Sequence, residues 1–113
     1  MKPHGLLPLS TPVFHILLAL ADADRHGYAI MKEVEDRTGG AVRLGPGTLY
    51  GAIKRLRDDG LIEEREDATD SERRRSYHLT PFGREVARLE AERLKAMVLT
   101  AEAKRLISST RTV

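Results

Sequence analysis

Proline and glycine mark most of the boundaries between the helices and strands expected in this chain. Thr-Pro pairs stand at positions 11–12 and 80–81, and Thr at the N-cap followed by Pro at the first helical position starts a helix. Gly39-Gly40 and Gly60 each follow a helical pattern, where glycine ends a helix in the left-handed conformation. The 113 residues are therefore predicted to form short elements around one small core.

The first two helical segments carry apolar residues at intervals of three and four. The first is predicted to begin at Thr11-Pro12, with Thr11 as its N-cap, and to end near Asp22. Residues 24–27 are predicted to form a turn, residues 28–38 the second helix, and residues 41–44 a single β-bridge at most. The core face of the second helix is predicted to consist of Tyr28, Met31 and Val34.

A third helix is predicted to begin at Gly45-Pro46-Gly47 and to be followed by a β-hairpin. Its core stripe consists of Leu49, Ile53 and Leu56. Gly60 and Leu61 fit a Schellman motif, in which Leu61 contacts Leu56 at the helix end. Strand-like residues at 61–65 and 74–79 flank a polar loop, and the second strand alternates with Arg75, Tyr77 and Leu79 on one face.

The last helix is predicted to run from Pro81 to about Leu106, on the order of 39 Å. This is longer than a domain of this size needs to cover its own core. Apolar residues continue along its distal half, where a second copy of the chain would cover them. The residues predicted to form this dimer interface are Ala87, Ala91, Leu94, Met97, Val98 and Ala101.

The predicted order of elements is three helices, a hairpin and a long helix. This makes the fold class mostly α with a small β-hairpin (α+β), a winged helix-turn-helix with a long C-terminal dimerisation helix. Residues 1–80 are predicted to form the DNA-binding domain with an N-terminal arm. Residues 81–107 are predicted to form the dimerisation helix, and residues 108–113 a frayed tail.

The overall charge gives little indication of a nucleic-acid partner. It is only +2, from 19 Lys and Arg against 17 Asp and Glu. Whether the chain binds nucleic acid must therefore be judged from where its cations lie. The face of the third helix opposite its core stripe carries glycines, which allow close backbone approach, followed by cations suited to phosphates. The residues predicted to contact DNA on this helix are Thr48, Tyr50, Gly51, Lys54 and Arg55.

The densest basic run, 73–75, lies where the hairpin loop meets the second strand. Arginine suits phosphates and narrow minor grooves, so Arg73 and Arg74 are also predicted to contact DNA. Arg75 shares a strand face with Tyr77 and is predicted to pair internally. The alternative interpretations are a solvated helix face and a charged edge strand that resists aggregation, with acids of the hairpin pairing with its arginines.

Enzymatic chemistry finds no support in the sequence. The chain has no Cys, which excludes disulfides, thiol nucleophiles and Cys-based zinc sites. The turn at 45–48 lacks the Gly-Lys-Ser/Thr of a P-loop, and the four histidines have no metal-ligand spacing. His15 is predicted to be a structural, partly buried residue rather than a ligand or a sensor.

No stretch reaches the roughly 18 apolar residues of a membrane span. We therefore expect a cytoplasmic protein with no cofactor, metal site or enzymatic activity.

Four groups of motifs, in register, resemble the PadR family of transcriptional regulators. They are His26-Gly27-Tyr28-Ala29-Ile30, Gly45-Pro46-Gly47-Thr48-Leu49-Tyr50 with Lys54-Arg55-Leu56 and Gly60-Leu61-Ile62, Arg73-Arg74-Arg75-Ser76-Tyr77, and Leu79-Thr80-Pro81-Phe82-Gly83. The resemblance covers roughly residues 11–100, and the length of the chain is similar to that of the short subgroup with a single C-terminal helix.

The resemblance implies a homodimeric DNA-binding repressor that a small-molecule effector releases. It also implies that the C-terminal helix and the N-terminal segment form the dimer interface. The expected partners are a palindromic double-stranded operator, with half-sites about one helical turn or a multiple apart, and a second copy of the chain. The alternative is a winged-helix protein-interaction module without a DNA role, which would carry acidic or apolar residues on the outer face of the third helix.

Overall fold

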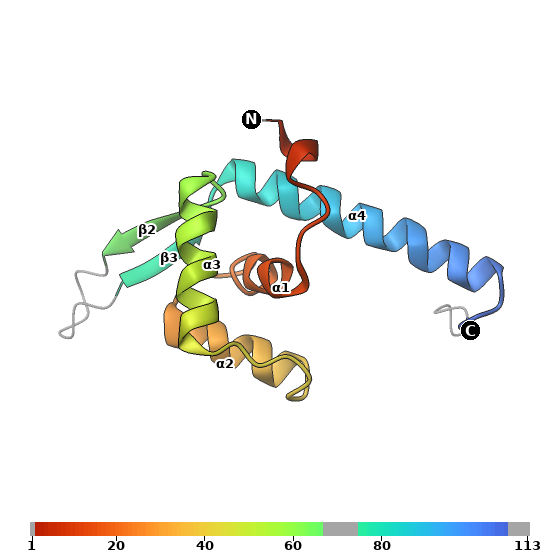
Figure 1. The fold of residues 1–113 in the computed structure, drawn as a ribbon, viewed down its shortest axis with the longest axis horizontal. Coiled ribbons are helices and arrows are strands. Elements are labelled where there is room, and N and C mark those ends of the chain that lie inside the picture. The colour runs from red at the N-terminus through yellow and green to blue at the C-terminus, as the bar shows by residue number, and fades with distance from the viewer. Residues whose placement is uncertain (1, 67–74, 109–113) are drawn as a thin grey trace.

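The computed structural model describes residues 2–66 and 75–108. Within these residues the chain forms four α-helices, a short 3-10 helix and a three-stranded antiparallel sheet (Figure 1), which confirms the predicted α+β class. The elements are η1 (Pro3–Leu6), α1 (Thr11–Ala19), β1 (Arg25–His26), α2 (Gly27–Arg37), α3 (Pro46–Asp58), β2 (Ile62–Glu66), β3 (Arg75–Leu79) and α4 (Pro81–Ala103). None of the helices in this part of the chain is both long and apolar enough to cross a membrane.

Helix α1 lies at the centre of the core and packs against α2 and α4. Its residues Ile16, Leu17 and Ala19 are fully buried. The core is completed by Ile30 and Val34 of α2, Leu49, Ile53 and Leu56 of α3, Tyr77 and Leu79 of β3, and Val86 of α4.

The boundaries of α1 differ from those predicted. Its N-cap is Ser10, whose Oγ accepts a hydrogen bond from the Val13 N–H at 3.4 Å, and not Thr11. Serine caps a helix as well as threonine does, and with two capping residues adjacent the sequence pattern alone does not select between them. The helix ends at Ala19, before the predicted Asp22.

Of the predicted core residues of α2, Val34 is confirmed, whereas the rest of the buried face differs from the prediction. Gly27, Ile30 and Val34 are its buried residues, whereas Tyr28 is 69% exposed and Met31 only partly buried. The core position at the start of the helix belongs to Gly27 because the ring of Tyr50, from α3, packs directly against it.

The predicted turn at 24–27 contains strand β1, which the sequence analysis missed. Arg25 pairs with Tyr77 and His26 with Ser76, so β1 joins the free edge of β3 in the order β1-β3-β2. The Arg25 Nε donates to the Ala19 carbonyl at 2.7 Å, which fixes this short strand to the end of α1. No strand or bridge is found at 41–44, although Leu44 is buried.

The junction of α3 with the hairpin has the predicted Schellman geometry. The Leu61 N–H donates to the Leu56 carbonyl at 2.9 Å and the Gly60 N–H to the Arg57 carbonyl at 3.0 Å, with Gly60 at φ +78°. Both leucines are buried. Strand β2 begins one residue later than predicted, and the predicted first residue of the second strand, Arg74, lies outside the described residues. The alternation that buries Tyr77 and Leu79 is confirmed.

Helix α4 begins at the predicted capping residue. The Thr80 Oγ1 accepts from the Gly83 N–H at 3.0 Å. The helix ends at Ala103, short of Leu106, because Arg105 adopts a left-handed φ of 61° and the Leu106 N–H returns to the Ala101 carbonyl at 2.9 Å. Its 23 residues still span about 35 Å, and its distal half projects beyond the rest of the fold (Figure 1).

The N-terminal segment crosses α4 and is held there by a buried carboxylate. Glu90, 1% exposed, accepts from the Leu9 N–H at 2.7 Å and from the Arg93 guanidinium, whose Nη2 lies 3.2 Å away. The hydrogen bond from Arg93, and then that from Leu9, hold the pKa of Glu90 below its ordinary value of 4.5 against the opposing effect of burial.

Gly83 allows α4 to pack against the end of α3. A Cβ at this position would lie only 2.8 Å from the backbone carbonyl carbon of Leu61, and closer still to its oxygen. We expect Gly83→Ala to lower the free energy of unfolding by about 1–3 kcal/mol or more. Thermal unfolding followed by circular dichroism measures this.

The matched control is Gly51→Ala, where a Cβ would meet nothing within 4 Å. There alanine should stabilise the helix by up to about 1 kcal/mol. Equal unfolding temperatures for the two variants would contradict the packing at Gly83.

The lowered pKa of Glu90 predicts a pH-dependent contribution to stability. A carboxyl whose folded-state pKa is depressed stabilises the fold above its unfolded pKa and loses this effect as the pH falls through the folded value. The wild-type protein should therefore be more stable than Glu90→Gln at about pH 7, and the difference should shrink as the pH falls below the ordinary carboxyl value of 4.5 and through the lowered pKa of Glu90. Denaturant unfolding of both proteins tests this, and a difference that stays constant with pH would refute it.

Candidate nucleic-acid interface

The outer face of α3 is open to solvent along its whole length. The core stripe is turned inward, and the five residues predicted to contact DNA all lie on exposed positions, namely Thr48, Tyr50, Gly51, Lys54 and Arg55. Helix α3 stands at the outside of the fold with α2 packed beside it and the hairpin next to its C-terminal half (Figure 1). This is the arrangement of a helix-turn-helix followed by a wing.

Glycines keep the N-terminal half of this face flat. A Cβ at Gly47 or at Gly51 would meet nothing within 4 Å, so no packing within the described chain requires glycine at either position. Glycine inside a helix costs about 1 kcal/mol relative to alanine. A surface that retains this cost without an internal reason is suited to a partner that approaches the backbone closely.

Tyr50 has a structural role in addition to its exposure. Its side chain is 50% exposed, but its ring lies against α2, where a Cβ on Gly27 would come within 2.9 Å of the ring carbon Cζ. Any other residue at position 27 would force the Tyr50 side chain to shift. The ring therefore fixes how closely the two helices of the helix-turn-helix pack.

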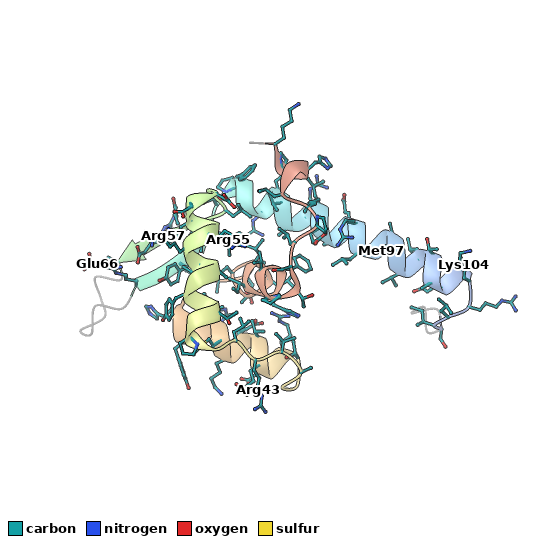
Figure 2. The ribbon with its side chains drawn as sticks, viewed as in Figure 1. Arg43, Arg55, Arg57, Glu66, Met97 and Lys104 are labelled. Carbon is teal, nitrogen blue, oxygen red and sulfur yellow. The ribbon has the colours of Figure 1, made fainter. Side chains whose placement is uncertain are left out.

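The cations of α3 divide between two sides of the helix. Lys54 forms an ion pair with Asp58 at 3.1 Å, with both side chains more than half exposed, and an exposed pair of this kind is weak enough to leave the ammonium group available. Arg55 lies on the other side, where it lines a shallow groove with the N-terminal segment. Figure 2 shows Arg55 and Arg57 on α3, far from Lys104 at the end of α4.

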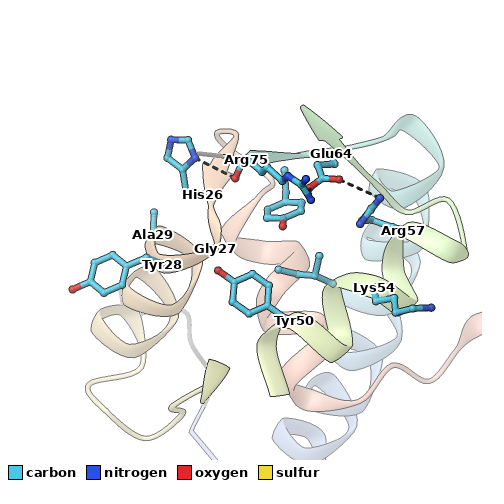
Figure 3. A pocket seen from close by; sticks show the side chains of 11 residues that line it. His26, Gly27, Tyr28, Ala29, Tyr50, Lys54, Arg57, Glu64 and Arg75 are labelled. Carbon is cyan, nitrogen blue, oxygen red and sulfur yellow. Dashed lines mark hydrogen bonds and ion pairs between the residues drawn. The ribbon is translucent and has the colours of Figure 1, made fainter. Parts of the chain in front are cut away.

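A second groove lies between the start of α2, the side of α3 and the sheet (Figure 3). One carboxylate holds two cations there: Glu64 Oε2 is 3.1 Å from Arg57 Nη2, and Glu64 Oε1 is 3.1 Å from Arg75 Nη1. The Glu64 side chain is 20% exposed, against 44% for Arg57 and 70% for Arg75. Burial, with Glu64 as the next contribution, raises the pKa of the Tyr77 hydroxyl on the same strand face.

The internal pairing predicted for Arg75 is confirmed. Arg57 was missed, and Glu64 was considered only as one of several hairpin acids that could pair with the arginines, an alternative that its ion pair with Arg75 bears out. Arg57 follows Lys54 by three residues, and Glu64 follows the buried Ile62 by two, so helical and strand periodicity could have placed each on its face. Nothing in either pattern shows that the two faces meet. Arg73 and Arg74 lie outside the described residues.

The histidines provide no metal centre within residues 2–66 and 75–108, where no group of three metal-ligating side chains occurs. His15 is instead part of the contact between α1 and α2. Its Nδ1 lies 3.0 Å from Nη1 of Arg37, which also pairs with Glu33 at 2.9 Å. Burial first, and then the charge of Arg37, lowers the pKa of His15, so the neutral imidazole accepts the hydrogen bond.

The predicted dimer residues differ in exposure along α4. Ala87 packs against the core of its own chain, and Leu94 and Ala101 are half-buried. Met97 and Val98 are 52% and 43% exposed, as is the neighbouring Leu99 at 53%. Ala91 is exposed as well, and the large exposed apolar side chains of α4 begin beyond Leu94.

Sequence comparison places this chain in a family of transcriptional regulators. The family described as "Transcriptional regulator PadR-like family" matches residues 16–89. The chain is 46% identical over 76 residues to an uncharacterized 37.1 kDa protein in transposon TN4556 of Streptomyces fradiae, and 41% identical over 70 residues to the transcriptional regulator Rv3488 of Mycobacterium tuberculosis. These alignments cover 67% and 62% of this chain, but only 21% and 63% of the two relatives.

Solved structures share the whole arrangement. A PadR family transcription regulator from Clostridium difficile superposes with a TM-score of 0.73 at 26% identity, over 87% of this chain and all of that one. Bacillus subtilis PadR, solved in complex with operator DNA, has the same fold with a TM-score of 0.62 at 22% identity, over 70% of this chain and 46% of that one.

Proposed function

The chain belongs to the PadR-like family of transcriptional regulators, and from this premise we propose that it is a homodimeric repressor that binds operator DNA through α3 and the hairpin. The expectation that it is not an enzyme agrees with this membership. The observation that carries the proposal is the outer face of α3, where Gly47 and Gly51 leave the backbone open and Lys54 and Arg55 follow on exposed positions.

This face suits the major groove of DNA. The groove is about 12 Å wide and admits one α-helix, and glycines let the helix axis come close to the base edges. Thr48, at the N-terminal end of α3, is placed to reach bases, whereas Lys54 and Arg55 are placed to hold phosphates. A protein-interaction module would instead present acidic or apolar residues here, so the alternative function is less well supported.

The wing completes the proposed contact with DNA. The strands β2 and β3 emerge beside α3 and lead into the segment that contains Arg73 and Arg74. We propose that these arginines contact the phosphate backbone or the minor groove. Residues 1–80 then form the DNA-binding unit.

We propose that residues 81–107 join two copies of the chain. Leaving Leu94, Met97 and Val98 in water forgoes roughly 1.5–3 kcal/mol each relative to burial, and a two-fold partner offers the same surface in return. Two-fold symmetry matches a palindromic operator. Family resemblance further suggests that a small-molecule effector releases the repressor from DNA.

Removing a phosphate-contacting cation should weaken binding to every sequence alike. We expect Lys54→Ala and Arg55→Ala each to reduce the slope of log affinity against log salt by about one phosphate contact. Fluorescence anisotropy with a duplex from the region upstream of the gene for this protein measures the slope. Lys104→Ala removes the same charge at the far end of α4 (Figure 2) and should leave the slope unchanged. Unaltered affinity and slope in both α3 variants would refute the placement of α3 on DNA.

Charge within the apolar stripe of α4 should separate the dimer. The double variant Leu94→Asp, Val98→Asp should be monomeric and should lose operator binding although α3 is untouched. Sedimentation or light scattering gives its mass. Ala96→Asp with Thr100→Asp introduces the same charges at the same spacing on another exposed face and should remain dimeric. A monomeric wild-type protein, or a dimeric Leu94, Val98 variant, would disprove this interface.

A further inference from the structure

We propose that Glu64 is a specificity-determining residue, whose carboxylate pairs with both Arg57 and Arg75 in the groove between α3 and the hairpin, offsets one of their two positive charges and so limits sequence-independent binding of DNA. This inference rests on the proposed function. It concerns a residue that makes no favourable contact with DNA itself and acts through the two cations it holds.

The groove lies where its charge would act on the phosphate backbone of bound DNA. If α3 occupies the major groove and the wing reaches the neighbouring minor groove, the strand that separates the two grooves passes between α3 and the hairpin. Lys54 and Tyr50, from the outer side of α3, line the same groove as Arg57 and Arg75 (Figure 3). A phosphate in this groove would therefore meet Arg57 and Arg75.

Glu64 offsets about half of this attraction, because one negative charge faces two positive ones. Each of its oxygens lies 3.1 Å from one guanidinium group. Among the described residues no other carboxylate lines the groove, although Asp58 pairs with Lys54 beside it. Attraction between cations and phosphates does not depend on sequence and supplies essentially all of non-specific affinity. A counter-ion at this point lowers binding to any duplex, so that recognition must come from the base contacts of α3.

The surroundings of Glu64 show that its charge is not required for packing. Its Oε1 is shielded from solvent and, among the described residues, has no partner with hydrogen-bond geometry, so the carboxylate is compensated only by ion pairing on that side. A partly desolvated carboxylate held in this way adds little to stability. The isosteric Glu64→Gln should therefore fold normally, which thermal unfolding verifies.

The test compares two variants with the same net charge. Glu64→Gln frees Arg57 and Arg75, whereas Glu63→Gln removes the adjacent charge on the opposite strand face, where Glu63 pairs with Arg65 at 2.9 Å. Affinity for the upstream duplex and for a scrambled duplex of equal length is measured from about 50 mM to about 200 mM salt. One added phosphate contact corresponds to a slope steeper by about 0.9 and, at about 0.1 M salt, to roughly eightfold tighter binding.

We expect Glu64→Gln to bind the scrambled duplex about eightfold more tightly and to discriminate less between the two duplexes, with Glu63→Gln close to wild type. Adding Arg57→Gln to Glu64→Gln should return the slope toward the wild-type value.

Equal behaviour of Glu64→Gln and Glu63→Gln would show a general charge effect and overturn the inference. Weaker binding by a folded Glu64→Gln would overturn it as well, because Glu64 would then support the contact. If wild type binds neither duplex at any salt concentration, the proposed function itself fails.

Discussion

The main chain of Leu61 connects the three parts of the molecule that DNA binding would require. Its N–H closes the end of α3 on the Leu56 carbonyl at 2.9 Å, and its carbonyl accepts from both the N–H and the hydroxyl of Thr80 at 3.0 Å. Thr80 in turn caps α4, and Gly83 leaves room for the same carbonyl. The position of α3 relative to the hairpin and to α4 therefore depends on the main-chain N–H and carbonyl of one residue, and a Cβ at position 83 would clash with that carbonyl.

Elements marked by local residues could be predicted from the sequence, and elements defined by distant partners could not. The end of α3 and the start of α4 follow from Gly60, Leu61 and Thr80, whose effects act within a few residues. Strand β1 exists because Arg25 and His26 pair with β3 far along the chain, and two residues show no periodicity. Gly27 is a core residue of α2 only because of the ring of Tyr50, which arrives from another helix.

The same distinction applies to the candidate site. The outer face of α3 follows from helical periodicity, because the buried stripe determines which residues remain outside. The ion pairs of Glu64 join α3 to both strands of the hairpin, and no pattern within one element predicts them. Pairing between acids and arginines of the hairpin could be considered from the sequence, but which carboxylate pairs with Arg75, and that it also reaches Arg57 of α3, depends on the tertiary fold.

The N-terminal segment adds a second connection between α4 and α3. Glu90 of α4 holds it at the Leu9 N–H, and residues on either side of Leu9 line a groove with Arg55 and Asp59 at the end of α3. Helix α4 is thus tied to α3 on one side through Leu61 and on the other through this segment. In a dimer joined by α4, two independent attachments would set the separation of the two α3 helices. That separation must match the spacing of operator half-sites, so a change at either attachment would act on DNA binding without altering any residue that touches DNA.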